Sequence, residues 1–410
     1  MMNEYSGDSH STPELVRDSK ALLLCEMSTV IFGIGIVILL SKELGSEDFG
    51  LWVAVFSIFQ ITSIMNFGFP TLIVRDAARR PEELSGILKV TRRAQILLGA
   101  LAIPSSILLS LFFYGNQING EWAILIVGFA YIFTVLQEIN RAGLRSLGQA
   151  PKEVFITLLD RGAVFFLFVY LGTLNGASIA SYAIAYNVGP ILGFILSYIL
   201  VSRLGNYKHG TDPRIGEILR NSAPFGVGII ARPFRDGGLR VLLSITGGFT
   251  VVAVFDIAWK AYTAGSSVTV AIRKSMLPRY SSASRSNNNL TDSLDHGYRI
   301  SKWIVQFGLF FGVASSFLIP FLFANDYSDS QLTFILLLSS WGLMTISSTW
   351  VVGVESLLEG RKYAILMLSQ LFITMLVAII LSWGNSLYAA IFGVISGELL
   401  ILWQSFRMIG

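Results

Sequence analysis

The chain has 410 residues, of which 53% are hydrophobic and 14% are charged, and its formal net charge is +4 at pH 7. With the 38 glycines counted as apolar, its apolar share exceeds the roughly 45–50% that is usual in soluble domains. The mean hydropathy of +0.64 points the same way. This composition excludes a soluble enzyme, a disordered chain and a nucleic-acid-binding protein. It predicts many membrane spans, each of about 20 residues.

Twelve apolar segments along the chain are long enough to cross a membrane as helices. Six precede a polar connector and lie near residues 21–41, 49–71, 94–114, 122–140, 154–172 and 177–201. Six follow it and lie near residues 221–247, 249–270, 302–323, 331–353, 364–383 and 387–406. The short alternating segments of a membrane β-barrel are absent from the sequence. We therefore expect an all-α polytopic membrane protein.

Basic residues in the connectors predict the orientation in the membrane. Connectors after even-numbered segments are rich in Arg and Lys, whereas those after odd-numbered segments contain Lys42 alone. Because basic connectors stay inside the cell, both termini are predicted to be cytoplasmic. The first 20 residues are polar, so we expect no cleavable signal peptide and an uncleaved first span.

Similar patterns recur in the two halves of the chain. LVRDSKALLL (15–24) precedes the first span much as ILRNSAPFGV (218–227) precedes the seventh. Two parallel six-helix repeats would be related by a pseudo-two-fold axis along the membrane normal, with a substrate path between them. The expected organisation is a cytoplasmic tail (1–20), an N-lobe (21–205), a cytoplasmic linker (206–220) and a C-lobe (221–410).

Charged residues inside the seventh segment are the main functional signal. They are Arg232, Arg235, Asp236 and Arg240, and at about 100° per residue they share a helical arc of about 140°. Each central arginine costs roughly 2.5–3.5 kcal/mol to insert, so these residues need partners, water or a bound anion. Asp256 and Lys260 in the next segment are expected to form an i,i+4 pair.

Two interpretations of the seventh segment remain open from the sequence. The first is a cationic cavity for an anionic substrate, because guanidinium groups bind phosphate oxygens in a bidentate manner. The second is that the helix begins later, so that Arg232 and Arg235 extend to the cytoplasmic edge of the membrane.

Other intramembrane charges are weaker candidates for cavity pairing or for binding a coupling H⁺ or Na⁺ ion. Glu26 is expected to pair with an arginine of the seventh segment or to carry a coupling proton. Asp160 and Arg161 are expected to form a structural pair, and Glu398 has no partner that the sequence identifies. Asp256 is a further candidate for coupling.

Catalytic and cofactor chemistry is not expected. The single cysteine, Cys25, lies in an apolar run, and the three histidines are far apart in polar connectors, so no metal site is predicted. The sequence has no nucleotide-binding or redox motif, and we predict no cofactor. The predicted external connectors are short, which disfavours a membrane polymerase or ligase.

Several strings of the sequence carry a family resemblance. They are LSKELGSEDFGLWVAVFSIFQ, NFGFPTLIVRDAAR, LRSLGQAPKEVFITLLDRG, LRNSAPFGVG and MLPRYSSAS. Their order resembles that of Wzx-type polysaccharide flippases, which transport O-antigen and capsule repeat units. These proteins belong to the multidrug/oligosaccharidyl-lipid/polysaccharide exporter (MOP) superfamily. Arg75 and Asp76 match the VRDAAR string, and the resemblance implies for them a cytoplasmic gate or a fold contact.

The resemblance implies two lobes that open alternately to either side of a bacterial inner membrane. It also implies an oligosaccharide substrate on a polyprenyl pyrophosphate carrier, and a monomer that works among membrane lipids beside a polymerase and glycosyltransferases. Alternatives within the superfamily are a cation-coupled multidrug antiporter and a lipid II flippase. An antiporter for cationic drugs should have an acidic cavity, so the arginines of the seventh segment argue against it.

Overall fold

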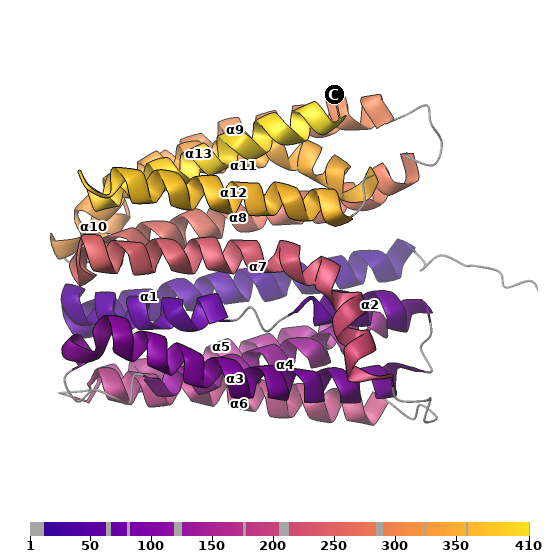
Figure 1. Cartoon of the computed structure of the whole chain (residues 1–410), viewed down its shortest axis with the longest axis horizontal. Coiled ribbons are helices and arrows are strands. Elements are labelled where there is room, and N and C mark those ends of the chain that lie inside the picture. Colours follow the sequence, from indigo (N-terminus) through magenta and orange to yellow (C-terminus); the bar gives the residue numbers. More distant parts are fainter. Residues whose placement is uncertain are drawn as a thin grey trace, which may run out of the picture.

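The computed structural model describes residues 12–62, 67–79, 83–118, 125–174, 178–204, 213–283, 290–323, 325–357 and 360–409. All regular elements in these residues are helices, which confirms the predicted all-α fold. The helices run roughly parallel or antiparallel to one another, with α1–α6 in one group, α8–α13 in the other, and α7 between them (Figure 1).

The first group contains six helices, and its first helix holds two predicted spans. The helices are α1 (Thr12–Thr62), α2 (Phe69–Arg79), α3 (Leu84–Ile118), α4 (Val127–Ser146), α5 (Pro151–Gly172) and α6 (Ile179–Leu204). Helix α1 is interrupted at Gly45, whose φ of 74° lies in the left-handed region that glycine adopts readily. Figure 1 shows that the chain reverses its direction within α1.

The rest of the chain continues the same architecture. Its elements are α7 (Ile215–Thr246), α8 (Phe249–Ala283), α9 (Leu290–Ser316), α10 (Ile319–Leu322), η4 (Asn325–Tyr327), α11 (Asp329–Leu357), α12 (Gly360–Leu381) and α13 (Ser386–Ile409). Helices overlap all twelve predicted segments, and eight described stretches are long and apolar enough to span a membrane. Helices α4, α7 and α8 lie outside these eight stretches and carry several charges, so the count of twelve spans stays a prediction.

Helix α7 contacts both groups of helices. Near its start, Ile218 packs in an apolar cluster with Phe69 and Leu72 of α2. Further along, a Cβ on Gly238 would lie 3.2 Å from the terminal methyl carbon of Met375 on α12. Residues 215–220, expected to belong to the linker, therefore begin a helix that bridges the two groups. The lobe boundaries themselves stay predictions.

The first group of helices contacts both α7 and the second group at the end of the molecule where α1 turns, which we call the Gly45 end. The hydroxyl groups of Tyr114 and Ser244 lie 2.6 Å apart. The hydroxyl group of Tyr327 donates to the carbonyl oxygen of Ser41 at 3.0 Å. These contacts join residues more than a hundred positions apart and close this end. The distribution of basic residues in the connectors predicts that this end lies outside the cell.

A close helix contact at the Gly45 end yields a first prediction. A Cβ on Gly50 of α1 would lie 2.0 Å from the carbonyl oxygen of Phe249, a backbone atom that cannot rotate away. We expect Gly50→Ala to separate α1 from α8 and open this end. In a Cys25→Ser background with Ser41→Cys, an impermeant maleimide added outside should then react several-fold faster with position 41.

Gly33→Ala is the matched control, because a Cβ on Gly33 would meet no atom within 4 Å. The control should react at the rate of the parent protein. Equal rates for the Gly50 and Gly33 variants would show that the contact with Phe249 does not hold the Gly45 end closed.

Candidate functional site

The charged residues predicted for the seventh span lie in the middle of α7, where they face neighbouring helices. Arg235, Asp236 and Arg240 are buried, whereas the side chain of Arg232 is 49% exposed. Helix α7 begins at Ile215, well before these residues. The buried position of Arg235 does not fit the interpretation in which it extends to the membrane edge.

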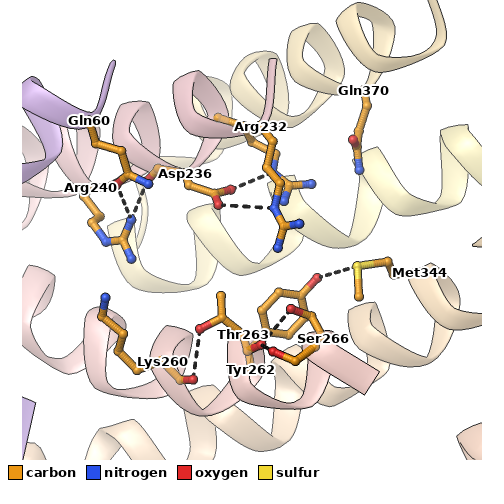
Figure 2. Close-up of polar contacts among 12 residues, drawn as sticks. Gln60, Arg232, Asp236, Arg240, Lys260, Tyr262, Thr263, Ser266, Met344 and Gln370 are labelled. Carbon is orange, nitrogen blue, oxygen red and sulfur yellow. Dashed lines mark hydrogen bonds and ion pairs between the residues drawn. The ribbon is translucent and has the colours of Figure 1, made fainter. Parts of the chain in front are cut away.

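Arg240 is held by a carboxylate of the neighbouring helix α8. Its Nε and Nη2 atoms lie 2.8 and 2.6 Å from Asp256 Oδ1. Its Nη1 donates to the backbone carbonyl of Asp236 at 3.1 Å and to Gln60 Oε1 of α1 at 3.5 Å (Figure 2). This buried cation is matched by a buried anion, so the pair adds little net charge to the site.

Arg235 forms a second buried ion network, which reaches α13. Its Nε donates to Asp236 Oδ1 at 3.0 Å, and its Nη1 donates to Glu398 Oε1 at 3.2 Å. The side chain of Gln370 on α12 also donates to Glu398 Oε1, at 2.8 Å. Glu398, for which the sequence identifies no partner, therefore holds α7 and α12 against α13.

Lys260 and Arg232 are less completely neutralised than the two buried arginines. The expected pair between Asp256 and Lys260 is wrong: among the described residues, no carboxylate oxygen lies within 4.0 Å of Lys260 Nζ. Arg240 on α7 binds Asp256 instead, and Lys260 and Arg240 point toward a common space in Figure 2. Arg232 Nε lies 3.9 Å from Asp236 Oδ2, beyond hydrogen-bonding distance.

The first group of helices contributes one more cation to this space. Arg161 of α5 is partly exposed and lies close enough to Lys260 of α8 to repel it electrostatically. Its own neighbour Asp160 is buried, with Oδ2 at 3.9 Å from Arg161 Nε. The expected Asp160–Arg161 pair is therefore loose, and the guanidinium group also interacts with Tyr186 of α6.

The balance of charge in the cluster leaves a small cationic excess. The cations are Arg161, Arg232, Arg235, Arg240 and Lys260, and the anions are Asp160, Asp236, Asp256 and Glu398. Close ion pairs fix Arg235 and Arg240, so the positive potential comes mainly from the three other cations. These three come from α5, α7 and α8.

Aromatic side chains line up beside these charges, which the sequence did not indicate. The ring of Trp259 lies 5.8 Å from the guanidinium carbon of Arg235 and 5.9 Å from that of Arg240. In the first group of helices, the ring of Phe56 packs on those of Tyr131 and Tyr186, with centroid distances of 5.3 and 5.4 Å. Aromatic side chains from both groups of helices thus lie near the central charges.

The remaining predicted residues lie apart from this cluster. Glu26 of α1 is exposed, near Cys25. The backbones of Arg75 and Asp76 belong to α2, but their side chains lie outside the described residues, and their predicted gate role stays a prediction.

A separate ion cluster joins α4 to α5. Glu138 forms an ion pair with Arg141 at 3.5 Å and also contacts Arg145. Arg141 Nε donates to the buried Glu153 Oε2 at 3.0 Å. Glu138, Arg141, Arg145 and Glu153 therefore form a network that fixes the turn between the two helices.

Comparison with known families and structures gives a consistent picture of the fold. Residues 15–284 match the family model described as "Polysaccharide biosynthesis protein". A sequence search among curated proteins found no match. Solved structures of MATE-family multidrug resistance transporters of the MOP superfamily are similar in fold. An inward-facing one gives a TM-score of 0.73 at 18% identity, covering 95% of this chain and 97% of that one.

Two further structures of the same superfamily are similar. An outward-facing MATE transporter gives a TM-score of 0.70 at 16% identity, covering 96% of this chain and 94% of that one. A MOP-superfamily transporter from Pyrococcus furiosus gives a TM-score of 0.69 at 18% identity, covering 97% of this chain and 95% of that one. That transporter is described as having a binding pocket of reverse polarity, which suggests a different function.

Proposed function

Because the chain belongs to the polysaccharide biosynthesis protein family, we propose that it moves oligosaccharides linked to a polyprenyl diphosphate across the inner membrane of a bacterium. Both termini would be cytoplasmic, as the distribution of basic residues indicates. The substrate carries at least two negative charges on its diphosphate, and these must cross the apolar part of the membrane inside the protein.

The observation that supports this proposal is the arrangement of the incompletely neutralised cations. Arg161 comes from the first group of helices, whereas Arg232 and Lys260 come from α7 and α8. A diphosphate between the two groups would accept hydrogen bonds from all three side chains. The partly exposed aromatic residues Tyr131 and Tyr186 would pack against the sugars or the start of the lipid chain.

Alternating access is part of the proposal. Proteins with this fold have been solved in inward-facing and outward-facing states. In the present structure the contacts Tyr114–Ser244 and Tyr327–Ser41 close the Gly45 end. Transport would require these contacts to break while the opposite end closes around α7.

A multidrug antiporter is the second candidate, because the similar structures named above include multidrug transporters. A cavity for cationic drugs needs free carboxylates, but Asp236, Asp256 and Glu398 all bind arginines of α7. The Pyrococcus transporter, which has a similar fold, is described as having a binding pocket of reverse polarity. The charges therefore favour an anionic substrate, with lipid II as a further member of that chemical class.

A vesicle experiment separates the two candidates. We expect purified protein to move a fluorescent polyprenyl diphosphate disaccharide between leaflets, so that an impermeant reductant bleaches almost all of it. In vesicles without protein, the reductant should bleach only the half of the fluorescent lipid that lies in the outer leaflet. Transport of a cationic dye without movement of the lipid would instead support the antiporter and reject the proposed substrate.

Coupling and partners belong to the same proposal. An H⁺ or Na⁺ gradient, or consumption of the product by a polymerase outside the cell, would give transport its direction. Glycosyltransferases inside the cell would supply the substrate. Glu398 is a poor coupling site, because Arg235 and Gln370 already bind it.

A further inference from the structure

An arginine at the edge of the third predicted span has fewer partners than its burial requires. Arg92 lies on α3, just before the apolar segment that begins near residue 94. Its Nε donates to Asn140 Oδ1 of α4 at 2.8 Å. Its Nη2 is buried without a hydrogen-bond partner, and none of the ion pairs of the described residues involves Arg92. Buried donors in proteins are normally satisfied, so this guanidinium group lacks an acceptor.

Side chains of two other helices hold the guanidinium group in one orientation. Asn140 donates in turn to Ser197 Oγ of α6 at 2.9 Å, and both residues are fully buried. The guanidinium carbon of Arg92 lies 4.8 Å from the centroid of the Tyr198 ring, also on α6. Helices α3, α4 and α6 lie side by side, so these contacts fix Arg92 in the groove between α3 and α6 (Figure 1).

The next residue of α3 shows what an unsupported arginine does at the same depth. Arg93 is exposed, whereas Arg92 is partly buried. An arginine that only extends to the membrane surface needs no buried amide and no aromatic ring to position it. The fixed guanidinium group of Arg92 is instead prepared for an acceptor, because its orientation costs little further entropy when a ligand binds.

The surface around Arg92 changes from basic to apolar along the direction of the membrane normal. Arg203 is exposed on α6, nearer to the end opposite the Gly45 end. Tyr198 is 46% exposed beside Arg92. One turn further into the membrane, Ile96 of α3 and Ile195 of α6 are exposed on the same helix faces. This order matches a phospholipid, whose phosphate lies at the membrane surface above its acyl chains.

We propose that the groove between α3 and α6 binds an anionic phospholipid of the cytoplasmic leaflet, with its phosphate on Arg92. The phosphate oxygens accept hydrogen bonds from the free nitrogen atoms of the guanidinium group. The acyl chains pack on Ile96 and Ile195. Basic pockets between helices on the cytoplasmic side of a membrane bind anionic headgroups in this way.

Charge selects the anionic headgroup over a zwitterionic one. The ammonium group of a zwitterionic lipid would lie close to Arg92 and Arg203, and like charges repel. The site is also distinct from the central cations, because the side chains that form it all belong to α3, α4 and α6. It therefore does not depend on the proposed transport function.

Native mass spectrometry of the full protein tests the site directly. The protein is mixed with equal amounts of phosphatidylglycerol and phosphatidylcholine that have the same acyl chains. The parent should retain phosphatidylglycerol preferentially, and Arg92→Gln should reduce that preference about tenfold, because it removes a charged hydrogen bond. Arg93→Gln is the matched control, since it removes the same charge one residue away, and it should keep the preference within about twofold.

Two results would overturn the proposal. Equal losses in Arg92→Gln and Arg93→Gln would show only a general attraction of the basic surface for anionic lipids. A parent without any preference for phosphatidylglycerol would show that the groove has no selective site.

A second variant and a second measurement cover the case in which Arg92→Gln fails to fold. Tyr198→Leu replaces an exposed ring and leaves Arg92 in place but less well oriented, so the preference should fall several-fold. Phosphatidylglycerol should also raise the thermal unfolding midpoint of the parent more than phosphatidylcholine does, because it binds the folded state. An unchanged preference in Tyr198→Leu, or equal midpoints in the two lipids, would contradict the proposal.

A polyprenyl diphosphate offers similar phosphate chemistry, and a transport assay distinguishes it from a phospholipid. In vesicles of phosphatidylcholine alone, Arg92→Gln should move the lipid-linked disaccharide at the rate of the parent. A slower rate there would assign the groove to the transported lipid and overturn the phospholipid site. If the parent moves no disaccharide, the proposed function fails, and the mass-spectrometric comparison still decides the lipid site.

Discussion

Arg240→Ala should strongly destabilise the protein, because it removes one member of a buried ion pair. Asp256 would be left without the guanidinium group that binds it at 2.6–2.8 Å, and the loss of one partner of a buried pair costs about 3–5 kcal/mol. Folded domains are stable by only about 5–15 kcal/mol in total. We expect a large fall in the yield of monodisperse protein in detergent and a lower midpoint of thermal unfolding.

A double replacement tests whether the ion pair itself stabilises the fold, or whether any substitution at this position of α7 destabilises the protein. Arg240→Met combined with Asp256→Leu removes both charges and fills similar space, a change that is often neutral or stabilising. The double variant should recover the yield and the midpoint of the parent. If Arg240→Ala alone unfolds at the parent temperature, the pair does not stabilise the fold.

The positions of the helices could be predicted from the sequence because they depend on local properties. Apolar runs of about 20 residues form helices in a membrane, since only internal hydrogen bonds can satisfy their backbone. In the described residues, helices overlap all twelve predicted segments. Even the turn within α1 has a local signal, since Gly45 adopts a φ of 74° that other residues rarely adopt.

Ion-pair partners could not be predicted, because they depend on how distant helices pack. Arg235 and Glu398 are separated by 163 positions, and nothing near either residue indicates the other. The i,i+4 spacing of Asp256 and Lys260 suggested a local pair. Arg240, on α7, binds the carboxylate of Asp256 instead. A contact between two helices therefore replaced the pair that the spacing within one helix suggested.

The neighbours Asp160 and Arg161 illustrate a second limit of local reasoning. Consecutive residues of a helix point about 100° apart, so opposite charges at adjacent positions rarely face each other. Asp160 turns toward Gln137 and the glycines of α6, while Arg161 turns toward Tyr186. These different neighbours could be identified only once α4 and α6 were placed around α5.

Replacing the incompletely neutralised cations should slow transport without destabilising the protein, whereas Arg240→Ala should destabilise it. Arg232 is half exposed, and Lys260 lies 4.0 Å or more from every described carboxylate oxygen, so neither holds a close ion pair. Replacing either by Gln should leave the unfolding midpoint within the error of the parent. Each loss of a charged hydrogen bond to phosphate, about 1.5–3 kcal/mol, should slow movement of the lipid-linked disaccharide about 10- to 100-fold.

Two controls make this result specific to charge at the central site. Lys302→Gln removes an exposed cation of α9 and should not change the transport rate, whereas Lys260→Arg should keep most of the parent's rate.

A substrate analogue tests which group Lys260 contacts. Lys260→Gln should slow the movement of a polyprenyl monophosphate, which offers less charge, by a smaller factor than the movement of the diphosphate. If both lipids slow equally, Lys260 does not contact the diphosphate. A stable but fully active Arg232→Gln, Lys260→Gln double variant would reject the cationic site, because those two positions supply most of its unmatched charge on α7 and α8.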